Sequence, residues 1–194
     1  MIKKIMLMSL VVCVGNGLQG AGSLPDGTVQ IQLSPAVQRK LDKKLQQAIK
    51  AGDGSLAREL IAQGANINRG ITEDGLGETL LHKVAKQCAE QCCSGLVSTG
   101  TSEDRLAKFK LLLELGADVK ACDFMGWTPL HTAAQEGLQV YCELLLEASA
   151  DINAVDTTGG TPAAYVDKDN VELFTWLQAQ GARVQKSALQ KFLR

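Results

Sequence analysis

Two histidines are the only imidazole side chains in this chain of 194 residues, so they are the first candidates for acid and base chemistry. His82 and His131 stand at the same place in two similar runs, Thr79-Leu80-Leu81-His82 and Thr128-Pro129-Leu130-His131. Neither a paired carboxylate motif, nor a phosphate-binding glycine loop, nor a zinc-protease motif accompanies them. The histidines therefore come without a recognisable catalytic setting.

Six cysteines are the second candidates for chemistry. Cys13 lies in the N-terminal leader described below, and the odd number that remains implies at least one unpaired thiol in an exported protein. Cys88 could close one disulfide with Cys92 or Cys93, and the same three residues could instead act as a thiol switch. We expect no metal site there, because the two-residue cysteine spacing of zinc sites is absent. Cys142 falls at a core position of an expected helix and should be buried.

The threonine and histidine runs belong to an internal repeat. Thr161-Pro162-Ala163-Ala164 follows the run at Thr128 after 33 residues. A second marker keeps the same phase, at Gly64-Ala65-Asn66-Ile67-Asn68, Gly116-Ala117-Asp118-Val119-Lys120, Ser149-Ala150-Asp151-Ile152-Asn153 and Gly181-Ala182-Arg183-Val184. Two markers that share one spacing are hard to obtain by chance, so the repeat is the main organising feature of the sequence.

Each unit carries the signals for two short helices. Thr128 is suited to cap a helix, Pro129 sits where a missing N–H costs nothing, and Gly137 can end that helix. Tyr141, Leu144 and Leu145 then give a second helix an apolar face. Because a single unit leaves this face in water, stability requires stacked neighbours.

This period and its two markers resemble the ankyrin repeat, most closely over residues 123–155 and more loosely over roughly 40–185. The resemblance implies an all-α ankyrin-repeat solenoid of about four helix-turn-helix repeats with short β-turn fingers. It also implies that both histidines make structural hydrogen bonds to backbone near the next repeat. The structural motif residues are Thr79, His82, Thr128, Pro129, His131, Thr161 and Pro162. With both histidines used in this way, we predict a protein that is not an enzyme and needs no cofactor.

The markers divide the chain into segments. We predict a first repeat at 36–73, a second at 74–122, a third at 123–155 and a fourth at 156–187, followed by a tail at 188–194. Repeat one is a polar N-terminal cap whose helix starts at Ser34-Pro35 and exposes Arg39, Lys40, Lys43 and Lys44. Repeat two contains 16 additional residues, which we place in an insertion near 86–104. Repeat four is a C-terminal cap that lacks one residue near 167–170.

Residues 1–22 are predicted to be a signal peptide. Lys3 and Lys4 precede an apolar run at 5–14, and small residues follow at 20–22. The run has about half the length that a membrane-spanning helix needs. We therefore expect an exported protein, periplasmic or secreted, which is not inserted in a membrane after cleavage and has a linker at 23–35.

The resemblance implies that the chain binds another protein through its finger tips and the adjacent face of the first helices. The corresponding positions are Phe124, Met125, Trp127, Gln135 and Glu136 in repeat three, Leu76 and Glu78 in repeat two, and Thr157 and Thr158 in repeat four. Exposed Phe, Met and Trp would form an apolar anchor, unless they pack against neighbouring fingers. We predict a monomer that binds an unknown protein, and the alternative function is a redox response of Cys88, Cys92 and Cys93.

The charge of the chain argues against nucleic acid as a partner. The net charge is -1 at pH 7, and Lys and Arg are spread along the sequence. A phosphate backbone requires a positive field that such a distribution does not supply.

Overall fold

The computed structural model describes residues 34–69, 77–94 and 102–184, with side chains at 34–69, 77–87 and 103–184. The helices in these ranges are α1 (Pro35–Ala51), α2 (Gly54–Ala62), α3 (Leu80–Ser94), α4 (Ser102–Glu114), α5 (Pro129–Gln135), α6 (Gln139–Glu147), α7 (Pro162–Tyr165) and α8 (Val171–Ala179). No strand occurs in the described ranges, so the prediction of an all-α chain is confirmed there. None of the described helices has the length and apolar character needed to cross a membrane. The chain separates into units at 1–40 and 41–194, and every tertiary contact discussed below lies within the second unit.

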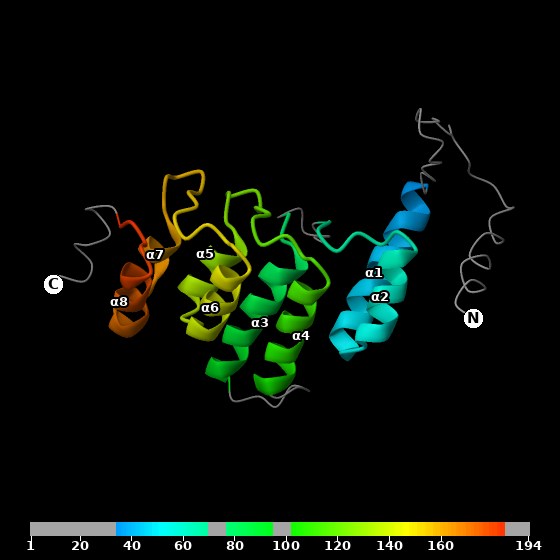
Figure 1. Ribbon diagram of the computed structural model, residues 1–194, viewed down its shortest axis with the longest axis horizontal. Helices are drawn as coiled ribbons and strands as arrows, with labels where there is room; N and C mark the ends of the chain where they lie inside the picture. The colour runs from blue at the N-terminus through cyan, green and yellow to red at the C-terminus, as the bar shows by residue number, and fades with distance from the viewer. Residues whose placement is uncertain (1–33, 70–76, 95–101, 185–194) are drawn as a thin grey trace, which may run out of the picture. The chain divides into compact units, whose positions relative to one another are not determined.

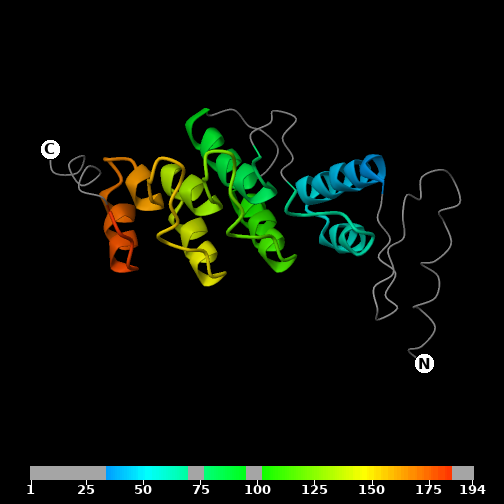
Figure 2. The same cartoon turned by 90° about the horizontal axis from the view of Figure 1, so that it is seen from above.

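The helices follow one another in pairs (Figure 1), and tight turns join α1 to α2 and α5 to α6. The first helices of successive pairs pack together, with α5 between α3 and α7, and the second helices α4 and α6 are in contact (Figure 2). Gly52 and Gly137 end α1 and α5 with φ of 76° and 72°, a backbone conformation that other residues adopt only with strain. The first helices of repeats one and three therefore end with a glycine in the same backbone conformation.

The insertion predicted near 86–104 is helical over part of its length. Helix α3 has 15 residues, whereas the equivalent α5 has 7. The backbone thus continues as helix through Cys88, Cys92 and Cys93 to Ser94, and α4 begins at Ser102. Much of the predicted insertion at 86–104 lengthens a helix, because Ala, Glu, Gln and Lys in this stretch favour helix over loop.

Repeat four has a shorter first helix than repeat three. Helix α7 spans four residues, and Val166 leaves the helix with φ of -56° and ψ of 136°. The chain then turns at 167–170 and enters α8. The predicted signal peptide, most of the linker and the C-terminal tail lie outside the described residues.

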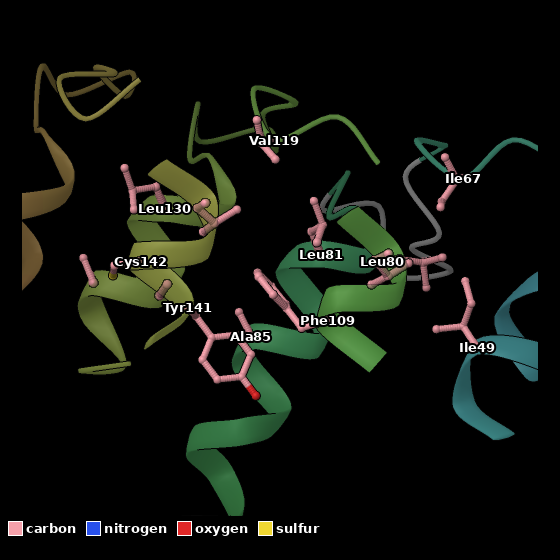
Figure 3. Close-up of a cluster of buried hydrophobic side chains, with 14 of the residues drawn as sticks. Ile49, Ile67, Leu80, Leu81, Ala85, Phe109, Val119, Leu130, Tyr141 and Cys142 are labelled. Atoms are coloured by element: carbon pink, nitrogen blue, oxygen red, sulfur yellow. The ribbon is translucent and has the colours of Figure 1, made fainter. Parts of the chain in front are cut away.

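The core runs through the described pairs and consists largely of Leu, Ala and Ile (Figure 3). Two aromatic residues join α4 to α6, because the rings of Phe109 and Tyr141 meet edge to face with centroids 4.6 Å apart. Cys142 is fully buried beside them, as its position predicts. Burial, with the nearby charge of Glu143, raises the pKa of this thiol to about 12, so it stays protonated and acts as a small apolar side chain.

Candidate protein-interaction surface

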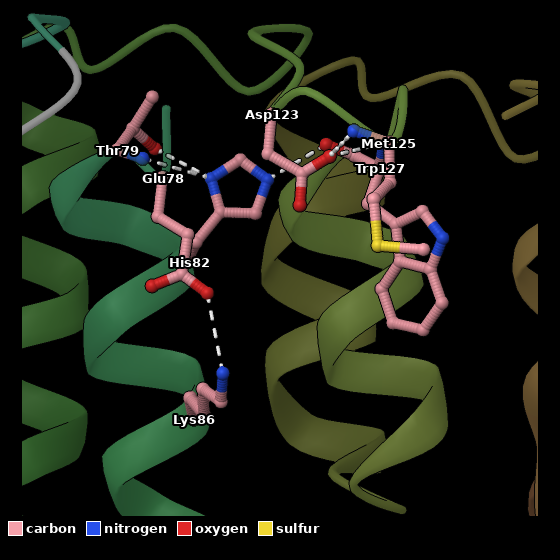
Figure 4. A network of polar contacts seen from close by, with 7 residues as sticks. All are labelled: Glu78, Thr79, His82, Lys86, Asp123, Met125 and Trp127. Atoms are coloured by element: carbon pink, nitrogen blue, oxygen red, sulfur yellow. Dashed lines mark hydrogen bonds and ion pairs between the residues drawn. The ribbon is translucent and has the colours of Figure 1, made fainter. Parts of the chain in front are cut away.

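The two histidines are fixed between a threonine of their own repeat and the backbone of the next. At His82, Nδ1 lies 3.2 Å from the Thr79 backbone nitrogen and 2.8 Å from its hydroxyl, while Nε2 lies 2.9 Å from the Trp127 carbonyl oxygen (Figure 4). His131 repeats this arrangement with Thr128 at 3.1 and 2.9 Å and with the Gly160 carbonyl oxygen at 3.3 Å. A carbonyl oxygen only accepts, so Nε2 carries the proton and Nδ1 accepts from threonine. These are the hydrogen bonds that the resemblance implies.

Both imidazoles are neutral in the folded protein. Burial lowers the pKa of each one below its ordinary value, against the opposing effects of the carbonyl contact and of Asp123. The exposed fractions of His82 and His131 are 1% and 0%, so neither side chain can reach a substrate from solvent. Their arrangement supports the structure between repeats and leaves no exposed imidazole base.

The finger of repeat three is a turn held by one carboxylate. Asp123 Oδ1 accepts from the backbone N–H groups of Met125 and Trp127, at 2.8 and 2.9 Å. The Asp123 N–H donates to the Trp127 carbonyl, and the Gly126 N–H donates to the Asp123 carbonyl. Gly126 has φ of 76°, and a Cβ there would lie 3.0 Å from the backbone of Thr157 in the next finger. Glycine meets both requirements without strain, so the turn and the close approach of the next finger explain the residue type at this position.

The fingers of repeats three and four are also joined to each other. Both the backbone N–H and the hydroxyl of Thr157 donate to the Met125 carbonyl, each at 3.0 Å. Thr158 turns back to Asp156 of its own finger, with its N–H at 2.7 Å and its hydroxyl at 2.8 Å from Oδ1. The polar groups of repeat four therefore serve to fix the fingers.

Phe124 and Met125 project from this rigid turn into solvent. Their exposed fractions are 70% and 54%, and Phe124 is the most exposed of the large apolar residues in the described ranges. One edge of the Phe124 ring lies over Gly77, where an added Cβ would meet it at 3.5 Å. We call Phe124 and Met125 the apolar tip.

Trp127 is not exposed beside the apolar tip, which corrects the prediction of a cluster of three exposed residues. Its indole packs against the Tyr165 ring with centroids 4.6 Å apart and stacks at 6.0 Å on His131. Tyr165 can reach the finger because α7 ends at this residue. Trp127 is therefore half-buried, as in the alternative of packing against a neighbouring repeat, and it belongs to the support of the tip.

The other predicted partner-binding residues are spread more widely. Gln135 is exposed at the end of α5, and Glu136, which caps that helix, is half-buried. Glu78 is half-buried and forms an ion pair with Lys86 at 3.2 Å. Leu76 lies outside the described residues. Among the predicted partner-binding residues that the structure describes, the geometry thus favours the apolar tip as the main contact for a partner protein.

A cluster around Asp156 was missed in the sequence. The Tyr165 hydroxyl donates to Asp156 Oδ2, and the Gly160 N–H donates to Oδ1 at 2.9 Å. Burial raises the pKa of Asp156, but these hydrogen bonds and those from Thr158 outweigh it and hold the pKa at about 2. The repeat-four motif has alanine where the other two motifs have histidine. This replacement was the one signal in the sequence that a different residue must stabilise the finger.

The cysteine hypotheses remain untested. The side chains of Cys88, Cys92 and Cys93 are not among those described, so their disulfide stays a prediction. Cys122 and Cys142 are free thiols, the first exposed and the second buried. Within the described residues, no group of three or more His, Cys, Asp or Glu side chains is placed to hold a metal ion.

Comparison with protein families agrees with this geometry. A family model described as ankyrin repeats in three copies matches residues 45–156 and, in a second overlapping alignment, residues 101–188. The chain belongs to the ankyrin-repeat family. The matches together span well over half of the chain and include the described helices from α2 to α8. Ankyrin repeats are generally protein-interaction modules, and the family is typically non-catalytic.

Proposed function

We propose that this ankyrin-repeat protein is exported and binds a partner protein through the apolar tip, Phe124 and Met125. The observation that carries the proposal is the exposure of these two side chains, 70% and 54%, on a turn that is otherwise hydrogen-bonded internally. Aromatic residues and Met are enriched in the cores of protein interfaces, because they bury a large apolar area with few rotatable bonds.

Rigidity of the tip supports the proposal. Asp123 fixes the turn from within, and Thr157 fixes it from the next repeat. A partner that binds a preformed surface does not lose free energy in ordering it, so a small apolar contact can contribute more to affinity.

Export rests on the sequence of the leader. A basic start, an apolar run of limited length and small residues at the expected cleavage point are the features of a secretory signal. The partner is accordingly sought outside the cytoplasm, among proteins of the same compartment.

The test is affinity capture with the wild type and a Phe124→Ser, Met125→Ser variant. Both changes remove apolar area from exposed positions without touching the core, so the variant should fold normally. We expect at least about a tenfold loss of affinity for the captured protein.

A matched control comes from another face of the same molecule. Val140 and Val171 have exposed fractions of 50% and 53%, on α6 and α8. A Val140→Ser, Val171→Ser variant should retain the partner. The proposal is wrong if the control variant loses the partner and the tip variant keeps it, or if both lose it equally.

A further inference from the structure

The apolar tip contains the one methionine of the described ranges, Met125, whose side chain is 54% exposed. Met1, Met6 and Met8 lie in the predicted signal peptide. If this peptide is removed on export, Met125 is the single methionine of the mature chain. A chemical change at methionine would then act on the surface that is proposed to bind the partner, and on no other part of the protein.

The backbone of Met125 is fixed on both sides, which keeps its side chain on the outside of the turn. Its N–H donates to Asp123 Oδ1 at 2.8 Å, and its carbonyl accepts the N–H and the hydroxyl of Thr157, each at 3.0 Å. Figure 4 shows the Met125 side chain extending from the turn that Asp123 holds. Because these hydrogen bonds use backbone atoms of Met125, oxidation of Sδ leaves all of them in place. An oxidised protein should therefore keep its fold and change only the surface of the tip.

Oxidation would make the side chain of Met125 polar. A thioether is apolar and adapts its shape to a neighbouring surface. A sulfoxide carries an oxygen that accepts hydrogen bonds from water, and burying it against an apolar surface costs free energy. Phe124, which is 70% exposed, is not changed by the reaction, so the tip would lose part of its apolar area and keep the rest.

We propose that Met125 is an oxidation site through which hydrogen peroxide reversibly weakens the binding of the partner protein. This inference rests on the proposed function and adds a mode of regulation to the same surface. A bond forms between Sδ and one peroxide oxygen while the O–O bond breaks, and the second oxygen leaves as water. Sulfur is oxidised by two electrons, and the peroxide is reduced by two.

The reverse reaction needs a methionine sulfoxide reductase and a dithiol. The S–O bond breaks, the oxygen leaves as water, and the dithiol is oxidised to a disulfide. Because Met125 is exposed in the folded protein, an enzyme can reach the sulfoxide without unfolding the chain.

The cysteines are competing targets for the same oxidant. Cys122 is an exposed free thiol next to the finger turn. Cys142 is buried, and with a pKa of about 12 it lacks the thiolate that reacts with a peroxide. Cys88, Cys92 and Cys93 carry the predicted thiol response, which is the alternative function. The experiment must therefore separate oxidation of the thioether from oxidation of thiols.

Peptide mapping by mass spectrometry after treatment with hydrogen peroxide tests the site itself, in a Cys122→Ser background. Met125 should gain one oxygen atom at a rate within about threefold of that of N-acetylmethionine amide, because access to sulfur governs the reaction. The circular dichroism of the oxidised protein should be unchanged.

Affinity for the captured partner protein tests the effect on binding. We expect complete conversion of Met125 to weaken binding about five- to tenfold. Reductases for both sulfoxide epimers should restore the affinity, whereas a thiol reductant alone should not. The matched control is Met125→Leu, which has an apolar side chain of similar size without sulfur. The readout is the ratio of affinities after and before peroxide for each protein, so a difference in their initial affinities does not enter.

Four results would overturn the proposal. The first is oxidation of Met125 that is more than about tenfold slower than that of the free amide. The second is an unchanged affinity after complete conversion. The third is an equal loss of affinity in Met125→Leu, or its recovery with a thiol reductant alone, either of which would assign the response to the cysteines. The fourth is a loss of helical structure on oxidation.

The Phe124→Ser, Met125→Ser variant separates this inference from the proposed function. If this variant loses the partner while the sulfoxide form keeps it, only the present inference fails. If this variant keeps the partner, the apolar tip is wrong as a binding surface. Conversion of Met125 to the sulfoxide and back would in that case still establish the oxidation site.

Discussion

Lowering the pH from 7 to 5 should reduce the free energy of unfolding through two groups, His82 and His131. The sequence contains no other histidine, so no other side chain has its ordinary pKa inside this interval. Burial lowers the pKa of both imidazoles in the folded state, and both accept a threonine N–H at Nδ1. If Nδ1 were protonated, two N–H donors would face each other and the hydrogen bond from threonine would be lost. Protonation of these histidines is therefore unfavourable in the folded state.

The sign follows from proton binding. Below the unfolded pKa of about 6.5, the unfolded chain binds protons that the folded chain does not, so stability falls as the pH falls. The upper limit of the loss between pH 7 and 5, which applies when the folded state binds no proton at either imidazole over this range, is about 2 kcal/mol per histidine, or about 4 kcal/mol in all. Asp156 adds little in this window, since its pKa of about 2 and its ordinary value of 3.8 both lie well below pH 5.

Urea unfolding followed by circular dichroism at pH 5, 6 and 7 measures this loss. A His82→Gln, His131→Gln variant should be less stable at pH 7 but nearly independent of pH over the same range. A wild type whose unfolding free energy stays flat or rises toward pH 5 would refute the assignment of both histidines as buried and neutral. If the double variant does not fold, His131→Gln alone should show about half of the wild-type dependence.

Three further substitutions test the packing and the finger. Phe109→Ala should lower the free energy of unfolding by about 3–5 kcal/mol, because the ring is fully buried against Tyr141, and chemical unfolding measures it. Gly126→Ala should cost about 1–3 kcal/mol, since it forces a side chain into a positive φ and against the next finger, and a variant as stable as the wild type would contradict this geometry. Tyr165→Phe removes a hydrogen bond to the buried carboxylate of Asp156, so the pKa of Asp156 should rise from about 2. An NMR titration measures this pKa, and an unchanged value would argue against the contact.

Much of the fold could be predicted because the repeat markers are local. A threonine cap, a proline at the first helical position and a glycine at the end each act through the nearest turn of backbone, as in α5. The positions of the histidines also repeat with the period, so their hydrogen bonds to the next repeat were implied by the resemblance.

The candidate surface was only partly predictable, because exposure depends on contacts between repeats. Trp127 was expected on the outside with Phe124 and Met125, yet the early end of α7 lets Tyr165 cover it. A ring of repeat four thus covers a residue of repeat three, and no local pattern around Trp127 predicts this contact.

The helical insertion shows one further limit. Residues after Ala85 contain enough helix formers to prolong α3, but the period only places the additional length between two helices and gives no sign of its conformation.

Photo-crosslinking from the apolar tip tests the central claim most directly. A photoreactive amino acid at Met125 should crosslink to the partner in its native compartment, whereas the same group at Val171, which has nearly the same exposed fraction, should not. Crosslinking from position 171 alone, or equally from both positions, would contradict the assignment of Phe124 and Met125 as the partner-binding anchor.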